Sequence, residues 1–202
     1  MAGYYDQNGD AFFERTAHLD MGAIWSAFLE PLPQRARILD AGCGSGRDAR
    51  HFGNLGHDIT AIDASPRMVE LASNFTGLPV RELRLQDLDY RDEFDGVWCC
   101  AAALHVPPAE LPAVLRKLHE ALKPGGVCYL SFKSGDGLRQ DGSRQFLDMS
   151  PEALASQTTA LEQVAVRRSW TTEQTRGTGQ TQLWTNQISQ RASRRRPDNA
   201  KD

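Results

Sequence analysis

From residue 37 onward, short apolar runs alternate with segments in which apolar residues recur every three or four positions. The apolar runs predict strands, and the recurring positions predict helices with one buried face. Alternating strands and helices are typical of a parallel sheet covered by helices on both faces. The predicted strands lie at 37–39, 59–63, 80–85, 94–103 and 127–132.

Helix signals stand between these runs. Ser65-Pro66 supplies a cap and a first-turn proline for one helix, which ends at Gly77-Leu78-Pro79. Pro107-Pro108 opens another helix, and Lys123–Gly126 is a turn that stops it before the next strand. The run Phe94–Ala103 is continuously apolar, as expected of a central strand covered on both faces.

The flanking segments are less regular. Ala11–Pro33 predicts one or two helices, with an apolar stripe around Trp25. Ser134–Arg144 is rich in Gly, Asp and Ser and is expected to be a mobile loop. Leu161–Trp170 and Gln180–Ser189 predict a closing antiparallel pair of strands.

A glycine-rich loop with flanking acids follows the first strand. Gly42, Gly44 and Gly46 alternate there, Asp40 precedes them, and Asp63 ends the second strand about 20 residues beyond the loop. Such glycines let a backbone approach a ligand closely, and an acid placed like Asp63 can bind ribose hydroxyls. The pattern therefore indicates a nucleoside-binding unit.

The spacing narrows the choice of nucleoside. A dinucleotide fingerprint requires Gly or Ala where this chain has Arg47, and the third glycine comes one residue early. The order acid, any, Gly, any, Gly, any, Gly resembles motif I of the class I S-adenosylmethionine (SAM)-dependent methyltransferases. Leu-Lys-Pro-Gly-Gly before the strand at 127–132 is a second resemblance to that family. Arg47-Asp48 is loosely similar to the tellurite-resistance-type members.

The resemblance implies a cofactor site at the ends of the first strands, in which SAM becomes S-adenosylhomocysteine. Asp40 would bind the methionine ammonium, Asp63 the ribose, and Asp87 and the Leu88 amide the adenine. Asp87 is alternatively a turn residue, and Met68 either packs on adenine or belongs to the core. The full expected set is Asp40, Ala41, Gly42, Cys43, Gly44, Gly46, Arg47, Asp63, Ala64, Met68, Gln86, Asp87, Leu88 and Ala101.

His105 follows the fourth strand, where many small-molecule methyltransferases place a histidine. It would be either a general base for the acceptor or a residue that fixes its loop by hydrogen bonds. Tyr4, Tyr5 and Phe13 resemble an N-terminal lid that closes over SAM and the acceptor; otherwise they anchor a frayed terminus.

The implied fold is α/β, a three-layer αβα sandwich with a mostly parallel seven-stranded sheet in the order 3-2-1-4-5-7-6. We expect a helical lid at 1–35, a SAM-binding domain at 36–190 and a basic tail at 191–202. The tail contains Arg194, Arg195 and Arg196; it is either a frayed terminus or a contact for RNA.

Composition limits the partners. A net charge of −3 gives no global attraction to nucleic acid or to an anionic membrane. Four cysteines without a C-x-x-C pair indicate reduced thiols, and the chain shows no apolar span or signal peptide. We therefore expect a cytoplasmic protein, a monomer or homodimer, with no metal, no membrane and no nucleic-acid partner.

The leading hypothesis is methyl transfer from SAM, by in-line displacement, to an O, N or S atom of a small molecule. The segment from Cys100 to Val106, after the fourth strand, lacks the Asp/Asn-Pro-Pro-Tyr/Phe and Pro-Cys motifs of DNA methyltransferases. An RNA- or protein-directed methyltransferase remains an alternative. More remote are a NAD-dependent oxidoreductase and a SAM-binding module without catalysis.

Overall fold

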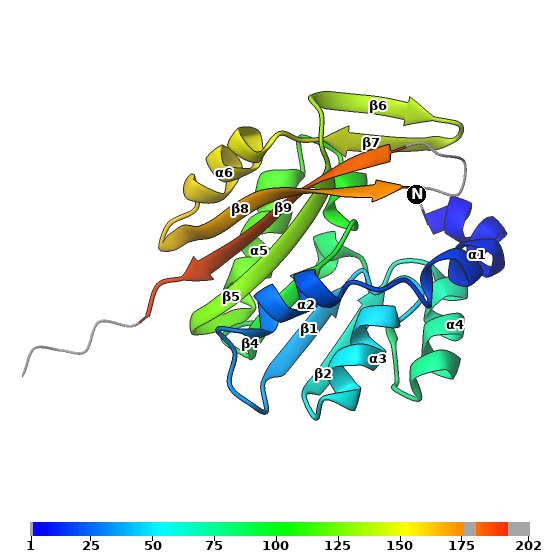
Figure 1. Cartoon of the computed structure of the whole chain (residues 1–202), viewed down its shortest axis with the longest axis horizontal. Coiled ribbons are helices and arrows are strands. Elements are labelled where there is room, and N and C mark those ends of the chain that lie inside the picture. Colours follow the sequence, from blue (N-terminus) through cyan, green and yellow to red (C-terminus); the bar gives the residue numbers. More distant parts are fainter. Residues whose placement is uncertain (1, 176–180, 194–202) are drawn as a thin grey trace, which may run out of the picture.

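The main sheet of the chain has seven strands in the order β3-β2-β1-β4-β5-β9-β8 (Figure 1). The computed structural model describes residues 2–175 and 181–193. The first five strands run parallel, whereas β9 is antiparallel to β5 and β8 is antiparallel to β9. The predicted mostly parallel sheet and its strand order are confirmed. The strands are β1 (Arg37–Ala41), β2 (Asp58–Asp63), β3 (Arg81–Glu82), β4 (Phe94–Cys99), β5 (Leu122–Lys133), β8 (Val164–Thr175) and β9 (Thr181–Arg191).

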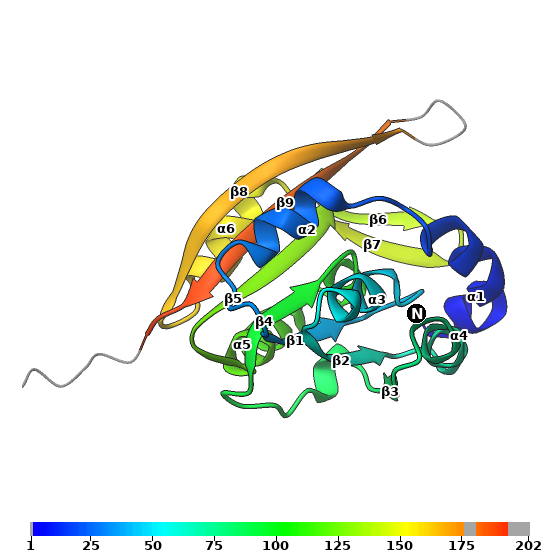
Figure 2. The ribbon, with the colours of Figure 1, turned by 60° about the horizontal axis from the view of Figure 1, so that its bottom comes forward.

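Helices cover both faces of this sheet, as the three-layer prediction requires. Helices α2, α3 and α4 lie on one face, α5 and α6 lie on the other, and α1 lies beside α4 (Figure 2). None of the helices in the described part of the chain is long and apolar enough to cross a membrane. The helices are α1 (Ala2–Thr16), α2 (Gly22–Leu29), α3 (Arg47–Asn54), α4 (Pro66–Thr76), α5 (Leu111–Glu120) and α6 (Pro151–Thr159).

Serine-proline pairs begin two of these helices. The Ser65 hydroxyl accepts a hydrogen bond from the Met68 amide, and Pro66 occupies the first turn of α4. Ser150 caps α6 in the same way. The pair at residue 65 was predicted to begin a helix, whereas no helix was predicted at the identical pair at residue 150.

The prediction of a mobile loop at Ser134–Arg144 is wrong. This segment contains most of a two-stranded hairpin, β6 (Gly137–Asp141) and β7 (Arg144–Asp148), joined by Gly142-Ser143. A two-residue turn that begins with glycine is typical of a hairpin, because its first position needs a positive φ. Gly142 has φ +61°, which glycine adopts without a steric clash. Of the residues that suggested mobility, Gly142 and Ser143 are therefore the turn of this hairpin.

Two predicted strands are shorter than expected. The strand predicted at 80–85 pairs only over Arg81–Glu82, after which the chain forms a 3-10 turn. The strand predicted over Phe94–Ala103 ends at Cys99. Ala101 has φ +52°, which turns the backbone out of the extended conformation.

Helix α5 starts at Leu111 and not at Pro107, because residues 103–110 form short turns first. The predicted turn Lys123–Gly126 lies inside β5, whose pairing with β4 shifts register between Phe94 and Gly96. At the other end of the sheet, Arg191 is the last residue of β9, so the predicted tail begins inside that strand. Arg194, Arg195 and Arg196 lie outside the described residues.

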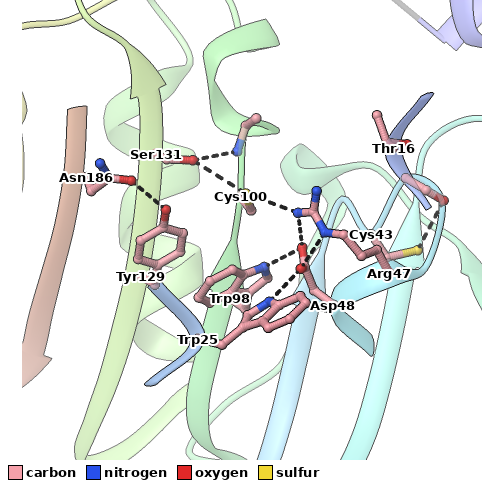
Figure 3. Close-up of polar contacts among 12 residues, drawn as sticks. Thr16, Trp25, Cys43, Arg47, Asp48, Trp98, Cys100, Tyr129, Ser131 and Asn186 are labelled. Carbon is pink, nitrogen blue, oxygen red and sulfur yellow. Dashed lines mark hydrogen bonds and ion pairs between the residues drawn. The ribbon is translucent and has the colours of Figure 1, made fainter. Parts of the chain in front are cut away.

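The buried carboxylate of Asp48 ties three elements together (Figure 3). Its Oδ1 accepts from the Trp25 indole at 2.8 Å, and its Oδ2 accepts from the Trp98 indole at 2.9 Å. The Arg47 guanidinium donates to both oxygens at 2.8 Å. Trp25 belongs to α2 and Trp98 to β4, so one side chain at the start of α3 fixes a helix and a central strand.

A second contact seats α2 on the sheet. Phe28 of α2 is fully buried against Phe52 and Trp98. A Cβ at Gly96 of β4 would lie 2.7 Å from the Phe28 ring and 3.0 Å from Leu32. Glycine at position 96 therefore leaves the space that Phe28 fills.

Gly96→Val should lower the free energy of unfolding by about 1–3 kcal/mol, because the added methyls overpack the Phe28 site. Urea unfolding measures the effect. Gly53→Ala in α3 is the control, since its Cβ would meet nothing closer than 3.8 Å. We expect that control to be about 0.5–1 kcal/mol more stable than wild type. Equal midpoints for Gly96→Val and wild type would contradict the seating of Phe28.

Asp48→Asn should cost about 3–5 kcal/mol of stability, since it leaves the Arg47 charge buried without its counter-ion and faces an amide N–H toward other donors. Thermal unfolding and near-UV circular dichroism of the two tryptophans report the change. Asp58→Asn removes a carboxylate whose ion pair with Arg37 is exposed to solvent. That control should stay within about 1 kcal/mol of wild type.

Candidate functional site

A cavity of about 1750 Å³ lies where the parallel strands end at their carboxyl side. The strand order reverses between β1 and β4, so the chain leaves these strands toward opposite faces and opens a crevice. A pocket for one small organic ligand encloses about 300–1,000 Å³. The cavity therefore has room for more than one such molecule.

The glycine-rich loop forms the first wall. At Gly42, with φ +82°, a Cβ would lie 2.4 Å from the Cβ of Ala102. At Gly44, with φ +53°, a Cβ would lie 3.3 Å from the Phe12 ring of α1. Both glycines line the cavity, together with Cys43, whose thiol has a pKa raised well above its ordinary value by burial. A protonated thiol packs there as a small side chain.

The third glycine of the loop has a different surrounding. At Gly46, with φ +77°, a Cβ would lie 2.7 Å from Thr76 and 3.1 Å from Ala72 of α4. Gly46 is not among the residues that line the cavity. Its lack of a side chain lets α3 begin directly against α4.

The carboxylate of Asp63 holds the loop in place. Its Oδ2 accepts from the Gly44 amide and its Oδ1 from the Ser65 amide, both at 2.9 Å. Burial raises the pKa of Asp63, and the hydrogen bonds from backbone N–H groups oppose that shift. Each carboxylate oxygen can accept more than one bond, so the side chain keeps acceptor capacity at the cavity wall.

Asp40 is more deeply placed. It is 1% exposed, and its Oδ2 has no hydrogen-bond partner among the described residues. Burial, and next the charge of Asp48, raise the pKa of Asp40 well above its ordinary value. An unsatisfied buried oxygen costs free energy, and a cationic donor reaching it would remove that cost.

Only some of the residues predicted to hold adenine line the cavity. Ala64, Met68 and Gln86 line the cavity, whereas Leu88 is buried in the core. Asp87 faces a shallower depression beside the cavity and forms an ion pair with Arg84 at 2.7 Å. That ion pair lowers the pKa of Asp87 through its hydrogen bonds.

Helix α1 lies over the cavity, next to the glycine-rich loop. Tyr4, Tyr5 and Phe12 line the cavity, whereas Phe13 packs edge-on against Phe75 of α4. The predicted lid side chain Phe13 therefore anchors the helix, and its neighbour Phe12 faces the cavity. An alternation of this kind follows from the helical period, which turns adjacent side chains about 100° apart.

Contacts with α4 fix the position of α1. The Asp6 carboxylate accepts from the Ser65 hydroxyl at 2.5 Å, and Asp10 pairs with Arg67. A Cβ at Gly9 would lie 2.6 Å from the Arg67 side chain, so glycine lets the two helices approach. Helix α1 is thus attached directly beside the Asp63 loop.

His105 ends the 3-10 turn Ala103–His105 that follows β4, and it lines the cavity. Its Nδ1 lies 3.4 Å from the Gln145 carbonyl, and its Nε2 lies 2.9 Å from the Tyr5 hydroxyl. A carbonyl only accepts, so this contact favours a proton on Nδ1 and leaves Nε2 to accept from Tyr5. Burial, followed by the positive charges of Arg144 and Lys133, lowers the pKa of His105 to about 4.

Several cavity residues around His105 were not predicted from the sequence. Lys133, Arg144 and Phe146 line the cavity. Ser131 also lines it, and its hydroxyl oxygen accepts a hydrogen bond from the Ala101 amide at 2.9 Å. Lys133, a charged residue at the end of an apolar strand, was the available signal. Within residues 2–175 and 181–193, no three His, Cys, Asp or Glu side chains are grouped to hold a metal ion.

The predicted residues thus divide into two groups. The cavity wall holds Gly42, Cys43, Gly44, Arg47, Asp63, Ala64, Met68, Gln86, Ala101, His105, Tyr4 and Tyr5. Asp40, Ala41, Gly46, Asp87, Leu88 and Phe13 are not among its lining residues.

Comparison with known proteins gives relatives for the central part of the chain. Residues 38–126 match a family model described as a methyltransferase domain. The ubiquinone biosynthesis O-methyltransferase of Xanthomonas axonopodis pv. citri (strain 306) is 39% identical over 113 residues, which are 52% of this chain and 46% of that protein. The chain spans about half the length of the curated relatives it matches.

Solved structures extend the likeness to most of the chain. The 1,6-didemethyltoxoflavin-N1-methyltransferase of Burkholderia thailandensis has a TM-score of 0.74 at 24% identity and covers 95% of this chain and 85% of that one. A SAM-dependent methyltransferase from Methanosarcina mazei has a TM-score of 0.74 at 20% identity and covers 87% and 100%. Residues 38–126 therefore match the methyltransferase domain model, and the chain as a whole shares its fold with these solved methyltransferases.

Proposed function

We propose that this chain binds SAM in the cavity and transfers its methyl group, by in-line displacement, to an O, N or S atom of a small molecule. The observation that carries the proposal is the Asp63 carboxylate, held by the Gly44 and Ser65 amides at the cavity wall. We infer that it binds the ribose hydroxyls. The protein would act in the cytoplasm, as a monomer or homodimer.

The residues present fit SAM better than a dinucleotide. Asp40 offers an unpartnered buried oxygen to an ammonium, with a water between them where needed. Asp48 lies in the first turn of α3, where a dinucleotide would place its pyrophosphate. Arg47 offsets the charge of Asp48 there, so the repulsion of a phosphate rests on the Asp63 carboxylate beside the loop. SAM carries a sulfonium and an ammonium, and no phosphate.

The remaining wall residues receive roles on the same basis. We assign Ala41, Gly42, Cys43, Gly44, Gly46 and Arg47 to the loop that holds the methionine part, directly or by shaping it. Ala64, Met68, Gln86, Asp87 and Leu88 form the adenine side, and Ala101 lies beside the methyl group. Bound SAM supplies an activated methyl group, so the protein's task is to position the acceptor in line and to exclude water.

Helix α1 is proposed to exclude that water. Tyr4, Tyr5 and Phe12 cover the cavity, and the contacts of Asp6 and Asp10 with α4 hold the helix closed. In this proposal residues 1–35 form the lid and cap, and residues 36–190 form the SAM-binding domain.

His105 is proposed to act on the acceptor side through Tyr5. Its Nε2 already accepts from the Tyr5 hydroxyl, so a proton leaving the acceptor would reach His105 by way of Tyr5. An imidazole with a pKa of about 4 is a weak base. The arrangement therefore suits orientation of the Tyr5 hydroxyl better than strong proton abstraction.

Transfer to a small molecule is distinguished from transfer to RNA or protein by incubating the chain with methyl-labelled SAM and fractionated cell extract. We expect label in the small-molecule fraction. Label in RNA or protein would support the alternative of an RNA- or protein-directed methyltransferase. Removal of residues 194–202 would then test whether the arginines at 194–196 are needed for that transfer. SAM binding without transfer to any fraction would indicate a binding module.

Asp63→Ala should weaken SAM binding by about 1–3 kcal/mol, because ribose hydroxyls would lose their buried acceptor. Gly44→Val should abolish binding, since its side chain would enter the cavity at a positive φ and meet Phe12. Calorimetry measures both. Asp58→Ala, at the opposite end of β2, is the control and should bind SAM normally. Tight binding of NAD, or normal SAM binding by both site variants, would refute the proposed site.

The imidazole of His105 should titrate near pH 4 and not near its ordinary 6.5, because burial disfavours its charged form. Its pKa is lower in the folded protein than in the unfolded chain. The neutral ring therefore contributes stability above about pH 6.5, and that contribution is lost as the pH falls toward 4. NMR of the histidine ring protons, assigned with His105→Asn, measures the midpoint. A midpoint at 6.5 or above would contradict the buried placement.

A further inference from the structure

The part of the cavity around His105 contains a group of cations arranged about one aromatic ring. The Lys133 ammonium lies 3.6 Å from the centroid of Phe146, and the guanidinium carbons of Arg139 and Arg144 each lie 5.0 Å from it. The His105 ring lies 4.9 Å from the same centroid. Lys133, Arg144 and Phe146 all line the cavity.

These cations come from elements that only the tertiary fold brings together. Lys133 ends β5 and is 5% exposed, whereas Arg144 begins β7 of the hairpin. A charged side chain is rarely this buried without a partner of opposite charge or a ligand. Lys133 therefore belongs to an arrangement that stabilises its charge inside the cavity.

Arg144 carries a more specific signal. One of its terminal nitrogens pairs with Asp141 at 3.1 Å, and its guanidinium lies 4.6 Å from the centroid of Tyr4. Burial raises the pKa of Tyr5, and the charge of Arg144 and a hydrogen bond from it oppose that shift. The Arg144 Nε–H itself is a buried donor that lacks an acceptor among the described residues.

Acidic side chains also lie near the ring, and two of them are already paired with arginines. Asp148 is engaged by Arg139 at 2.6 Å, and Asp141 by Arg144. Glu173 also lines the cavity, from β8. The positive charges of Arg144 and Lys133 reach His105, since both lower its pKa.

We propose that this cationic end, formed by Lys133, Arg144 and Phe146, binds the methyl acceptor, and that the acceptor is a planar conjugated anion, with a carboxylate or an ionised hydroxyl on its ring. The inference rests on the proposed function, because it assigns the second half of the same cavity. The aromatic rings of Tyr4, Tyr5 and Phe146 form the walls against which a flat molecule packs.

This arrangement also bears on the proton. Lys133 and Arg144 stabilise an acceptor oxygen that has already lost its proton to solvent. The lone pair of that oxygen, or of an atom conjugated with it, forms the bond to the methyl carbon. The electrons of the breaking S–C bond go to sulfur, which becomes a neutral thioether. No proton has to reach His105, which agrees with its low basicity.

Binding of matched probes tests the proposal without the natural acceptor. The chain is saturated with S-adenosylhomocysteine, and calorimetry then compares benzoate with benzamide and 2-naphthoate with 2-naphthamide. We expect at least one carboxylate to bind about tenfold or more tightly than its amide, the effect of one charge-assisted hydrogen bond. Bound carboxylate should also raise the pKa of His105 by offsetting the nearby cations.

Two variants test whether the carboxylate probe binds at Lys133 and Arg144. Lys133→Met and Arg144→Gln should each lower carboxylate affinity about tenfold and leave the amides unchanged. Lys123→Met, at the other end of the same strand, is the control and should keep the preference. Unchanged affinity for S-adenosylhomocysteine shows that a variant is folded.

The possible failures are distinguishable. Equal affinity for carboxylates and amides in both pairs, including no binding of either, would overturn the proposed acceptor. A preference that survives in both Lys133→Met and Arg144→Gln would overturn it as well. Failure of the wild-type chain to bind S-adenosylhomocysteine or SAM would instead overturn the proposed function. In that case the carboxylate and amide probes are compared in the absence of S-adenosylhomocysteine.

Discussion

The carboxylate of Asp48 is the interaction on which the geometry of the cavity depends. Two indole N–H groups and a guanidinium satisfy it in a place that water scarcely reaches. Because a buried carboxylate is costly without its donors, Trp25, Trp98 and Arg47 are held at fixed positions. Those residues belong to α2, β4 and the start of α3. The glycine-rich loop is consequently locked against the central strand whose end forms the opposite wall.

The two halves of the cavity rest on different physics. The half around Asp63 is built by backbone geometry, since Gly44 bends where a side chain would collide and its amide donates to the carboxylate. The half around Phe146 is built by charge and aromatic packing among distant segments. Helix α1 joins them, because Asp6 contacts Ser65 on one side and the neighbouring Tyr5 contacts His105 on the other.

Local patterns predicted the fold well where a strand is buried on both faces or a helix carries its own cap. The central strands β1 and β4 and helix α4 are of this kind. The prediction was wrong at residues 134–144, where a mobile loop was expected and the chain forms strand β6 and the Gly142-Ser143 turn of a hairpin. The sequence also did not show that Phe13 packs against Phe75 of α4, because which side of a helix faces a cavity depends on what packs against the other side.

The sequence by itself determined the nucleoside half of this protein, because the glycines, Asp40 and Asp63 lie within one βαβ unit and their spacing alone carries the meaning. Only the tertiary structure decided the other half. Lys133, Arg144 and His105 come from different elements, and nothing in their spacing along the chain brings them to one ring. The physical reason is that hydrogen bonds of a loop are local, whereas burial and charge depend on every segment that packs around a site.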